Sequence, residues 1–263
     1  MLYDLLIKNL LKDNNINGLF KYNLFTGNIE FASIPLWKHS GIEGGIKSKP
    51  INDVDVLNLK RYISATHSMD ISIQKLNEIV MSLAQEITYH PLKDYLDTLE
   101  WDNVPRLDKW LIEICGCKDK ENHKEVGLKM LCAACHRIRR PGSKFDYMAI
   151  LEGDQGIGKS TLLNILGGQW YLDTHLSTSE NKKDIVDTMR TAWIIEISDF
   201  AGFKKQDIEY LKSFISRQVD RVRMAYAHRA EDFPRQCVFI GTHNPSGDNT
   251  YFRDDTGNRR FWP

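Results

Sequence analysis

Residues 147–164 read YMAILEGDQGIGKSTLLN and constrain the fold more than any other part of the chain. They open with a short apolar run, 147–151, which is bounded by glycine and is typical of a buried β-strand. The segment 153–160 then matches the pattern G-x-x-x-x-G-K-[ST] at every fixed position, and a helix is predicted from Thr161 onward. A strand, a glycine loop and a helix in this order predict an α/β unit with an anion site at the start of the helix.

The residue types of this loop suit the phosphates of a nucleoside triphosphate. Its glycines let the main chain curl around an anion without Cβ clashes, so that several N–H groups point at it. Lys159 is expected to reach the β- and γ-phosphates, and the Ser160 hydroxyl to ligate magnesium. ATP and Mg²⁺ are therefore the predicted cofactors. The predicted ATP-binding residues are Gly153, Asp154, Gln155, Gly156, Ile157, Gly158, Lys159, Ser160 and Thr161.

Charge and hydropathy limit the partners that the chain can have. Its 263 residues carry 35 Lys plus Arg against 35 Asp plus Glu, so any surface for nucleic acid must be local rather than global. We find no apolar run of membrane-spanning length and no signal peptide at the start of the chain. A cytoplasmic protein without a membrane partner is the resulting prediction.

Five cysteines give an odd count without a regular framework, which argues against a secreted disulfide scaffold. The string Cys132-Ala-Ala-Cys135-His136 formally fits a haem-attachment motif, and Cys115 and Cys117 lie upstream, so a zinc or haem site is conceivable. However, residues 129–137 have the pattern of an apolar helix, where cysteine is usually a small core residue. We favour that second interpretation.

The predicted fold class is α/β, with three regions along the chain. Residues 1–95 form a small mixed α/β region, 96–142 a helical connector, and 143–263 a P-loop core of the AAA+ type, with a mostly parallel sheet flanked by helices. Helices are expected at 2–16, 52–63, 73–87 with Ser72 as its cap, 92–99, 107–114 and 121–139, and a hairpin at 18–31.

A second strand is predicted at 191–200, where an apolar run ends in acidic residues as a Walker B strand does. One carboxylate should hold the magnesium shell and a second should polarise the attacking water. The candidates are Glu196 and Asp199, which point to opposite faces if the strand continues through both. Because catalytic groups of such sheets lie at the carboxyl ends of strands, we favour Asp199 as the magnesium ligand. Glu196 stays open between a catalytic and a structural carboxylate.

A helix at 204–214 precedes the most basic part of the chain. Between 212 and 229, five basic residues stand against a single acid, Asp220, and Tyr226 and His228 lie among them. This composition suits contact with a phosphate backbone and stacking on bases, while a solvated face or a subunit contact is the alternative. The predicted DNA-binding residues are Lys212, Arg217, Arg221, Arg223 and Arg229.

A third apolar strand at 236–244 ends in Asn244, the place at which ATPases of the AAA+ type carry a polar sensor residue. Its amide could hold a water molecule or the γ-phosphate. Arg259 and Arg260 follow and could supply an arginine finger across a subunit boundary. The last residues, 261–263, are apolar enough to require burial, so we expect a truncation or a further tail beyond them.

Five stretches of the sequence together resemble one family. They are HPLKDYLDTLEWDNVPRLDKWL, PGSKFDYMAILEGDQGIGKSTLL, WIIEISDF, LKSFISRQVDRVR and CVFIGTHNPSGDNTYFRDDTGNRRFWP. The chain resembles the virulence-associated E family of phage and pathogenicity-island proteins, which is similar in turn to superfamily three helicases. The resemblance covers nearly the whole length, and only the glycine loop would match many unrelated ATPases.

The resemblance implies an AAA+-like ATPase that replicates a mobile element as a ring-forming, hexameric helicase on single-stranded DNA. The roles it implies are phosphate contact for Lys159 and Ser160, the acidic pair for Glu196 and Asp199, the sensor for Asn244, and the finger for Arg259 or Arg260. Two positions depart from the family pattern. Asp199 stands where glutamate is usual, and His243 stands where a second threonine is usual.

Other classes of function make different demands on the sequence. A nucleotide-dependent switch or assembly factor, which recruits replication or packaging partners, would turn ATP over slowly and without stimulation by DNA. A small-molecule kinase needs an acceptor pocket and a lid, and we find no lid-like insertion with paired arginines between the strands. A DNA-binding module without enzymatic activity would leave the acidic residues and the arginines without a role.

Overall fold

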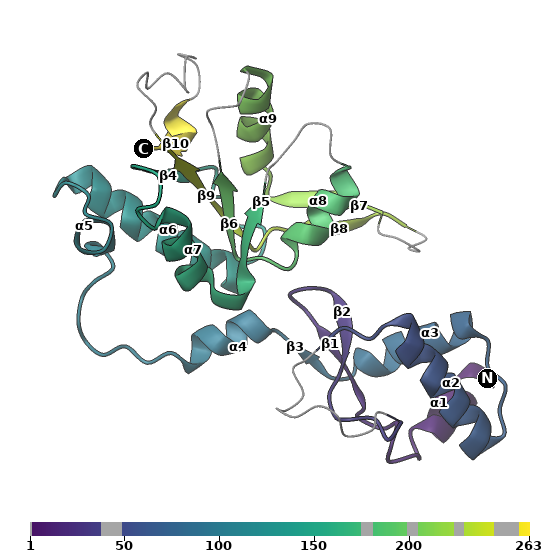
Figure 1. Ribbon diagram of the computed structural model, residues 1–263. Coiled ribbons are helices and arrows are strands. Elements are labelled where there is room, and N and C mark those ends of the chain that lie inside the picture. Colours follow the sequence, from purple (N-terminus) through teal and green to yellow (C-terminus); the bar gives the residue numbers. More distant parts are fainter. Residues whose placement is uncertain (1, 38–48, 175–180, 199–204, 224–228, 245–257) are drawn as a thin grey trace. The chain divides into compact units, whose positions relative to one another are not determined.

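The structure is a computed structural model that describes residues 2–37, 49–174, 181–198, 205–223, 229–244 and 258–263 (Figure 1). The chain divides into two compact units, Met1–Asp97 and Thr98–Pro263. Each unit has an apolar core and is described by itself. Within the described ranges, none of the helices combines the length and the apolar character that crossing a bilayer requires.

The first unit is a three-stranded sheet with helices. Strand β1 pairs antiparallel with β2 and parallel with β3, which gives the order β2-β1-β3. The elements are α1 (Leu2–Leu10), β1 (Phe20–Asn23), β2 (Asn28–Phe31), α2 (Asp53–His67), α3 (Ile73–Ala84), β3 (Thr88–Tyr89) and α4 (Pro91–Thr98). Its core joins Leu10, Phe20, Leu59, Leu76 and Ile79 from three helices and a strand.

Two side chains fix where helices of this unit begin. The Asn52 side chain accepts a hydrogen bond from the Asp55 backbone N–H at 3.0 Å, and the Asp55 carboxylate accepts one from the Asn52 N–H, which is a capping box. Ser72 accepts from the Lys75 N–H at 3.4 Å, which confirms the expected cap of α3. The helices predicted for this unit are all present, although α1 ends at Leu10, well before the expected residue 16.

The second unit carries the glycine loop. Its helices are α5 (Trp110–Glu113), α6 (Glu121–Arg139), α7 (Lys159–Gly167), η1 (Gly168–Trp170), α8 (Lys182–Met189), α9 (Lys205–Ile215) and η3 (Asn258–Arg260). Its strands are β4 (Met148–Glu152), β5 (Tyr171–Thr174), β6 (Ile194–Ser198), β7 (Val219–Val222), β8 (Glu231–Pro234), β9 (Val238–His243) and β10 (Phe261–Trp262).

Five of these strands form one parallel sheet in the order β10-β4-β9-β6-β5. Every residue of β9 is buried, as are the first four residues of β6, which explains why both strands are mostly apolar in sequence. Since β9 lies between β4 and β6, the carboxyl ends of these three strands are neighbours. The expected mixed α/β class with a parallel, helix-flanked sheet is confirmed.

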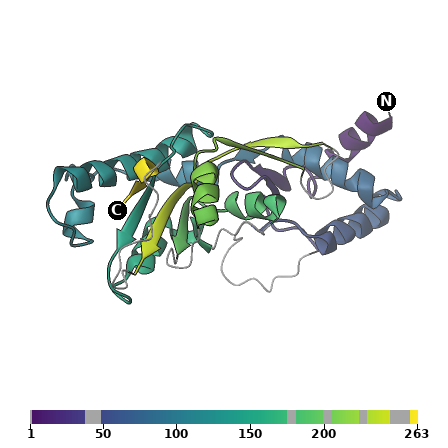
Figure 2. The ribbon, with the colours of Figure 1, turned by 90° about the horizontal axis from the view of Figure 1, so that it is seen from above.

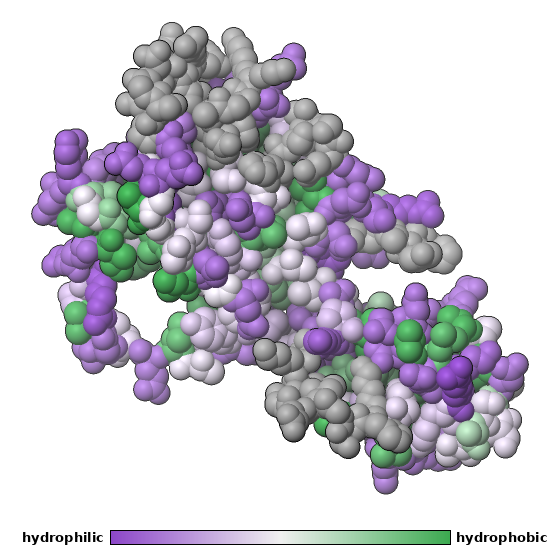
Figure 3. All heavy atoms as spheres, in the orientation of Figure 1, coloured by the Kyte–Doolittle hydropathy of each residue, from purple (hydrophilic) through white to green (hydrophobic). Residues whose placement is uncertain are grey.

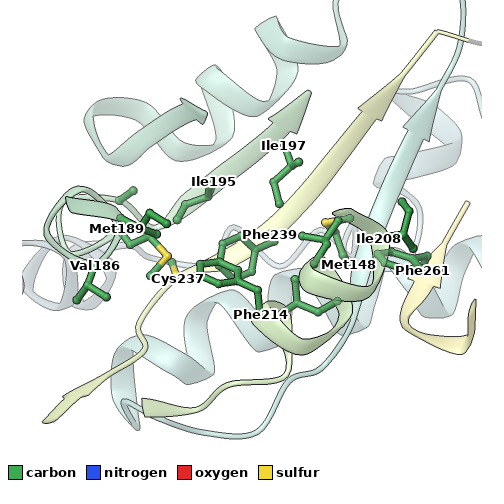
Figure 4. Packing of buried hydrophobic residues seen from close by; sticks show 14 of the residues in the cluster. Met148, Val186, Met189, Ile195, Ile197, Ile208, Phe214, Cys237, Phe239 and Phe261 are labelled. Atoms are coloured by element: carbon green, nitrogen blue, oxygen red, sulfur yellow. The ribbon is translucent and has the colours of Figure 1, made fainter. Parts of the chain in front are cut away.

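Helices cover both faces of this sheet (Figures 1 and 2). On one face, α6 is fixed by a hydrogen bond from the Trp193 indole N–H to the Ala134 carbonyl at 3.0 Å, and α7 packs on β5 and β6. On the other face, α8 and α9 bury Met189, Ile208 and Phe214 against the sheet (Figure 4). This burial holds β4, β6 and β9 in register and so holds their carboxyl ends at one edge.

Several short elements were not predicted from the sequence. They are β5, α8 and the strands β7 and β8, which pair antiparallel as a hairpin. The apolar residues Phe261 and Trp262 form strand β10 on the free side of β4, and Phe261 is 4% exposed. Trp262 also stacks on Tyr147, with ring centroids 4.4 Å apart. The burial that these residues were expected to need is thus provided inside the unit.

The close packing of α7 on the sheet depends on Gly167. A Cβ at this position would lie 2.8 Å from the Tyr171 Cβ and 3.1 Å from the Ile194 Cβ. We expect Gly167→Ala to lower the free energy of unfolding by about 1–3 kcal/mol, because it overpacks this region. Ile165→Ala on the exposed side of the same helix is the control and should change it by less than about 0.5 kcal/mol. Thermal melts of both variants measure the difference, and equal melting temperatures would contradict the packing argument.

The surface mixes hydrophilic and hydrophobic residues (Figure 3). Several large apolar side chains of the segment between α4 and α6 are exposed, including Trp101 at 70% and Ile114 at 67%. Asp102 and Arg106 are linked near the start of this segment, where the Asp102 carboxylate accepts two hydrogen bonds from Arg106 at 2.9 and 2.8 Å. These bonds lower the pKa of Asp102 to about 2. Because the pair is exposed, its contribution to stability is small.

Candidate functional site

The glycine loop joins β4 to α7 with a backbone that few other residues could adopt. Gly156 and Gly158 have φ values of 85° and 96°, in the left-handed region. A Cβ at either glycine would meet nothing within 4 Å, so the backbone conformation, rather than a lack of space, requires glycine here. Gly158 is the N-cap of α7, which therefore begins at Lys159 with its first N–H groups facing the loop.

A pocket of about 420 Å³ lies at the carboxyl edge of the sheet. The loop and the first turn of α7 form one side, and the ends of β6 and β9 form the other. Its lining is mostly polar and includes Lys159, Ser160, Glu196, Thr242 and Asn244. Side chains that the sequence placed in three separate motifs are thus brought into one pocket.

Glu196 is the buried acid of this pocket, with 0% of its surface exposed. Its Oε1 accepts hydrogen bonds from the Ser160 hydroxyl at 2.7 Å and from the Thr242 hydroxyl at 2.6 Å. Its Oε2 accepts from the Tyr171 phenol at 2.5 Å. Burial, followed by the bond to Glu196, raises the pKa of Tyr171, so the phenol keeps its proton and donates. Three hydroxyl groups thus satisfy this buried carboxylate.

Lys159 has three acceptors around its ammonium group. The Nζ donates to the Gly153 carbonyl at 2.7 Å, to the Asp154 carbonyl at 2.9 Å and to the Asn244 side-chain oxygen at 2.8 Å. An ammonium group has three donors, so these bonds use all of them. Asn244 follows β9 directly, which places the predicted sensor against the lysine of the loop.

The structure describes one of the two acidic candidates. Glu196, which the sequence left open, is the carboxylate that contacts Ser160, whereas Asp199 lies outside the described residues. Ser198, the last residue of β6, instead donates to Asp173 of β5 at 3.2 Å. The period-two rule explains the contact of Glu196, because every second residue of β6 faces α7.

Two residues of this cluster were missed by the sequence analysis. Thr242 had a signal, since it stands two residues before Asn244 in the strand predicted at 236–244, where residues two apart share a face. Tyr171 had none, because β5 is four residues long and carries no motif. Only the pairing of β5 with β6 places its phenol next to Glu196.

The two arginines near the end of the described chain do not line the pocket. Arg259 is exposed in η3. Arg260 is half-buried, and its Nε donates to the Ser216 hydroxyl at 3.0 Å. Neither residue therefore meets Lys159 or Glu196 of the same chain.

The predicted DNA-binding residues fall into two environments. Arg221, Arg223 and Arg229 are exposed on and beside the β7–β8 hairpin, and Arg221 pairs with Asp232 at 3.3 Å. Arg217 lies over the Phe214 ring at 5.2 Å. By contrast, Lys212 is buried on α9 and donates to Glu209 at 2.9 Å, so it does not belong to the exposed basic surface.

The base of the hairpin contains a buried ion pair. Arg235 Nε and Nη2 donate to the two carboxylate oxygens of Asp220 at 2.6 and 3.1 Å, and both side chains are at most 2% exposed. Arg235 Nη1 also donates to the Phe214 carbonyl at 2.5 Å. The pair therefore ties the hairpin to the end of α9.

The cysteines show no shared site in the described part of the chain. Cys132 is exposed and Cys135 half-buried on α6, and all five cysteines are free. Burial raises the pKa values of Cys115, Cys117, Cys135 and Cys237. Among the described residues, no group of three or more His, Cys, Asp and Glu side chains could hold a metal ion.

Comparison with known proteins gives one family match. The model of the virulence-associated protein E-like domain matches residues 96–263. No curated protein matches the chain.

Similar solved structures include three apo forms of the NrS-1 C-terminal region. The A form has a TM-score of 0.47 at 12% identity, with 99% of this chain and 59% of that chain covered. A second apo structure has a TM-score of 0.47 at 13% identity and coverages of 99% and 60%. A further A form has a TM-score of 0.46 at 12% identity and coverages of 93% and 56%. The chain thus spans less than two thirds of the length of each.

Proposed function

The chain belongs to the virulence-associated protein E-like family over residues 96–263, and from that premise we propose that it is an ATP-hydrolysing motor acting on single-stranded DNA. In this proposal the second unit is an AAA+-like P-loop core of a replicative helicase from a phage or another mobile element. The order of its parallel strands, with β9 between β4 and β6, supports this assignment because it brings the loop, Glu196 and Asn244 to one edge.

The observation that carries the proposal is the hydrogen bond between the Ser160 hydroxyl and Glu196 Oε1, 2.7 Å long, inside the pocket that also holds the Lys159 ammonium group. A hydroxyl and a carboxylate oxygen side by side are the ligands that magnesium takes in P-loop sites. The residues present therefore fit Mg²⁺-ATP: loop N–H groups and Lys159 for the phosphates, Ser160 and Glu196 for the cation. When bound, Mg²⁺ would neutralise charge on the phosphate oxygens.

Binding of phosphates would change the partners of Lys159. Its ammonium group donates hydrogen bonds to two loop carbonyls and to the Asn244 side-chain oxygen, all of them neutral acceptors. Phosphate oxygens carry full negative charge and form stronger, charge-assisted hydrogen bonds. Lys159 would therefore leave Asn244, whose amide could then orient the attacking water. With Glu196 assigned to the cation, we assign Asp199, which the sequence analysis favoured as the magnesium ligand, to polarising that water.

The positions of Arg259 and Arg260 outside the pocket lining support a site shared between subunits. Stabilising the γ-phosphate charge in the transition state needs a further cation, and Lys159 is the one cationic side chain among the described residues that line the pocket. We place Arg259 or Arg260 of a neighbouring subunit in that role, within a homo-oligomeric, hexameric ring. Alanine in place of the arginine that acts as the finger would then inactivate the neighbour's site in a mixed ring, whereas alanine in place of the other would not.

The β7–β8 hairpin is the proposed contact with DNA. We expect Arg221→Ala combined with Arg223→Ala to weaken binding of single-stranded DNA and to lower the salt slope by about 1 for each phosphate that is no longer neutralised. The control removes the same charge elsewhere, by Arg61→Ala combined with Arg140→Ala. Fluorescence anisotropy of a labelled oligonucleotide over a range of salt concentrations measures both effects. If the hairpin variant binds with the wild-type slope, DNA binds elsewhere on the chain.

Steady-state ATP hydrolysis with and without single-stranded DNA tests the function itself. A motor should be stimulated severalfold by DNA. Slow turnover that DNA does not change would instead favour the nucleotide-dependent switch or assembly factor. Absence of hydrolysis under every condition of assembly would overturn both.

A further inference from the structure

Tyr171 is a half-buried tyrosine whose hydroxyl faces the acid of the pocket. It is the first residue of β5, the edge strand of the sheet, and pairs with Ile194 of β6. From there the phenol reaches Glu196 two residues further along β6 and donates to its Oε2 at 2.5 Å. No motif of the sequence includes this tyrosine, and it does not line the pocket.

The three hydroxyl groups around Glu196 divide its two oxygens. Oε1 accepts from Ser160 and Thr242, while Oε2 accepts from Tyr171. The terminal torsion of a glutamate is broad, so the carboxylate plane is not fixed by the side chain's own rotamer preference. A donor on each oxygen fixes that plane. The Tyr171 phenol therefore helps to fix the orientation in which a carboxylate oxygen lies beside Ser160.

The helix that carries Ser160 also packs against Tyr171. The end of α7 approaches β5 so closely that a Cβ on Gly167 would lie 2.8 Å from the Tyr171 Cβ. Ser160 in the first turn and Gly167 at the last residue belong to this one helix. The helix thus places the Ser160 hydroxyl on one oxygen of Glu196 and packs against the residue that holds the other.

We propose that Tyr171 is a positioning residue for the magnesium site, an inference that rests on the proposed function. By holding Oε2, its phenol keeps Oε1 of Glu196 next to the Ser160 hydroxyl, where the cation binds. Tyr171 touches neither nucleotide nor cation in this account. It acts through the carboxylate, in the way that outer partners orient metal ligands.

The test compares Tyr171→Phe with Tyr210→Phe. Both changes remove one hydroxyl from a half-buried tyrosine, and Tyr210 lies on α9, where it stacks on Phe214. Binding of a fluorescent, non-hydrolysable ATP analogue is titrated with Mg²⁺ and repeated in EDTA. We expect Tyr171→Phe to raise the apparent Mg²⁺ dissociation constant by about 10-fold or more, as removal of an outer partner does, and to leave binding in EDTA at the wild-type level. Tyr210→Phe should match the wild type in both.

A double-mutant cycle separates positioning from a purely structural cap. In a Glu196→Gln background, Tyr171→Phe should no longer change the Mg²⁺ dependence, since the carboxylate through which it acts is gone. Independent, additive effects would overturn the proposal, as would a wild-type Mg²⁺ affinity in Tyr171→Phe. These outcomes differ from failure of the proposed function, in which the wild-type chain itself would bind the analogue without any dependence on Mg²⁺.

Discussion

Replacing Lys159 with alanine is expected to lower kcat/KM for ATP hydrolysis by at least about 100-fold, as removal of one charge-stabilising donor does in enzymes of other classes. The ammonium group of Lys159 lies in the pocket, where it donates hydrogen bonds to the loop carbonyls of Gly153 and Asp154. Alanine removes this charge from the place at which phosphates are proposed to bind. It leaves the glycine backbone and the start of α7 intact.

Lys129→Ala is the matched control, because Lys129 is exposed on α6 and pairs with Glu125 one helical turn away. Surface pairs of this kind contribute little, so its activity should equal that of the wild type. Far-ultraviolet circular dichroism and melting temperature establish that both variants are folded. Wild-type hydrolysis by a folded Lys159→Ala variant would remove the loop from the mechanism.

Asp220→Ala should have the largest effect on stability, a decrease of about 3–5 kcal/mol in the free energy of unfolding, because it leaves the buried guanidinium of Arg235 without its counter-ion. Arg235 is 3% exposed and lies over the Phe214 ring at 4.3 Å, so water cannot reach the charge without local opening. The decrease should appear as a lower melting temperature of the second unit, followed by calorimetry.

Asp232→Ala provides the comparison within the same hairpin. Asp232 also pairs with an arginine, Arg221, but their side chains are 55% and 68% exposed. This change should cost less than about 1 kcal/mol, since exposed pairs are solvated and weak. Similar melting temperatures for the two variants would show that burial of the Asp220–Arg235 pair does not matter for stability.

The sequence predicts those parts of the site that have a local pattern. The loop at 153–160 has fixed residues at fixed spacing, and the buried strands β6 and β9 are short, mostly apolar segments, so the loop and both strands could be found without a structure. The N-cap at Ser72 is local in the same sense. In each case a few neighbouring residues determine the conformation, and tertiary packing only confirms it.

Features that depend on pairing between distant segments could not be predicted. Tyr171 reaches Glu196 only because β5 pairs with β6, and Arg235 reaches Asp220 only because β7 pairs with β8. Counting charges also ignores burial, which is why Lys212 was grouped with surface arginines although it is buried on α9. A buried cation and a surface cation look alike until the fold is known.

The contact of Glu196 shows the same limit. The sequence left the role of Glu196 open, and only the structure shows its hydrogen bond with the Ser160 hydroxyl at 2.7 Å. Which strand residue faces the loop depends on the register of β6 against β9, where Glu196 lies opposite Ile240. That register is set by packing on both faces of the sheet.

Calorimetric titration of the chain with a non-hydrolysable ATP analogue, in Mg²⁺ and in EDTA, tests the central claim most directly. If the loop and Glu196 together form a nucleotide site, the analogue binds in Mg²⁺, binds more weakly in EDTA, and fails to bind Lys159→Ala. An analogue that gives no heat at millimolar concentration, or that binds equally well without Mg²⁺ and without Lys159, would contradict the claim.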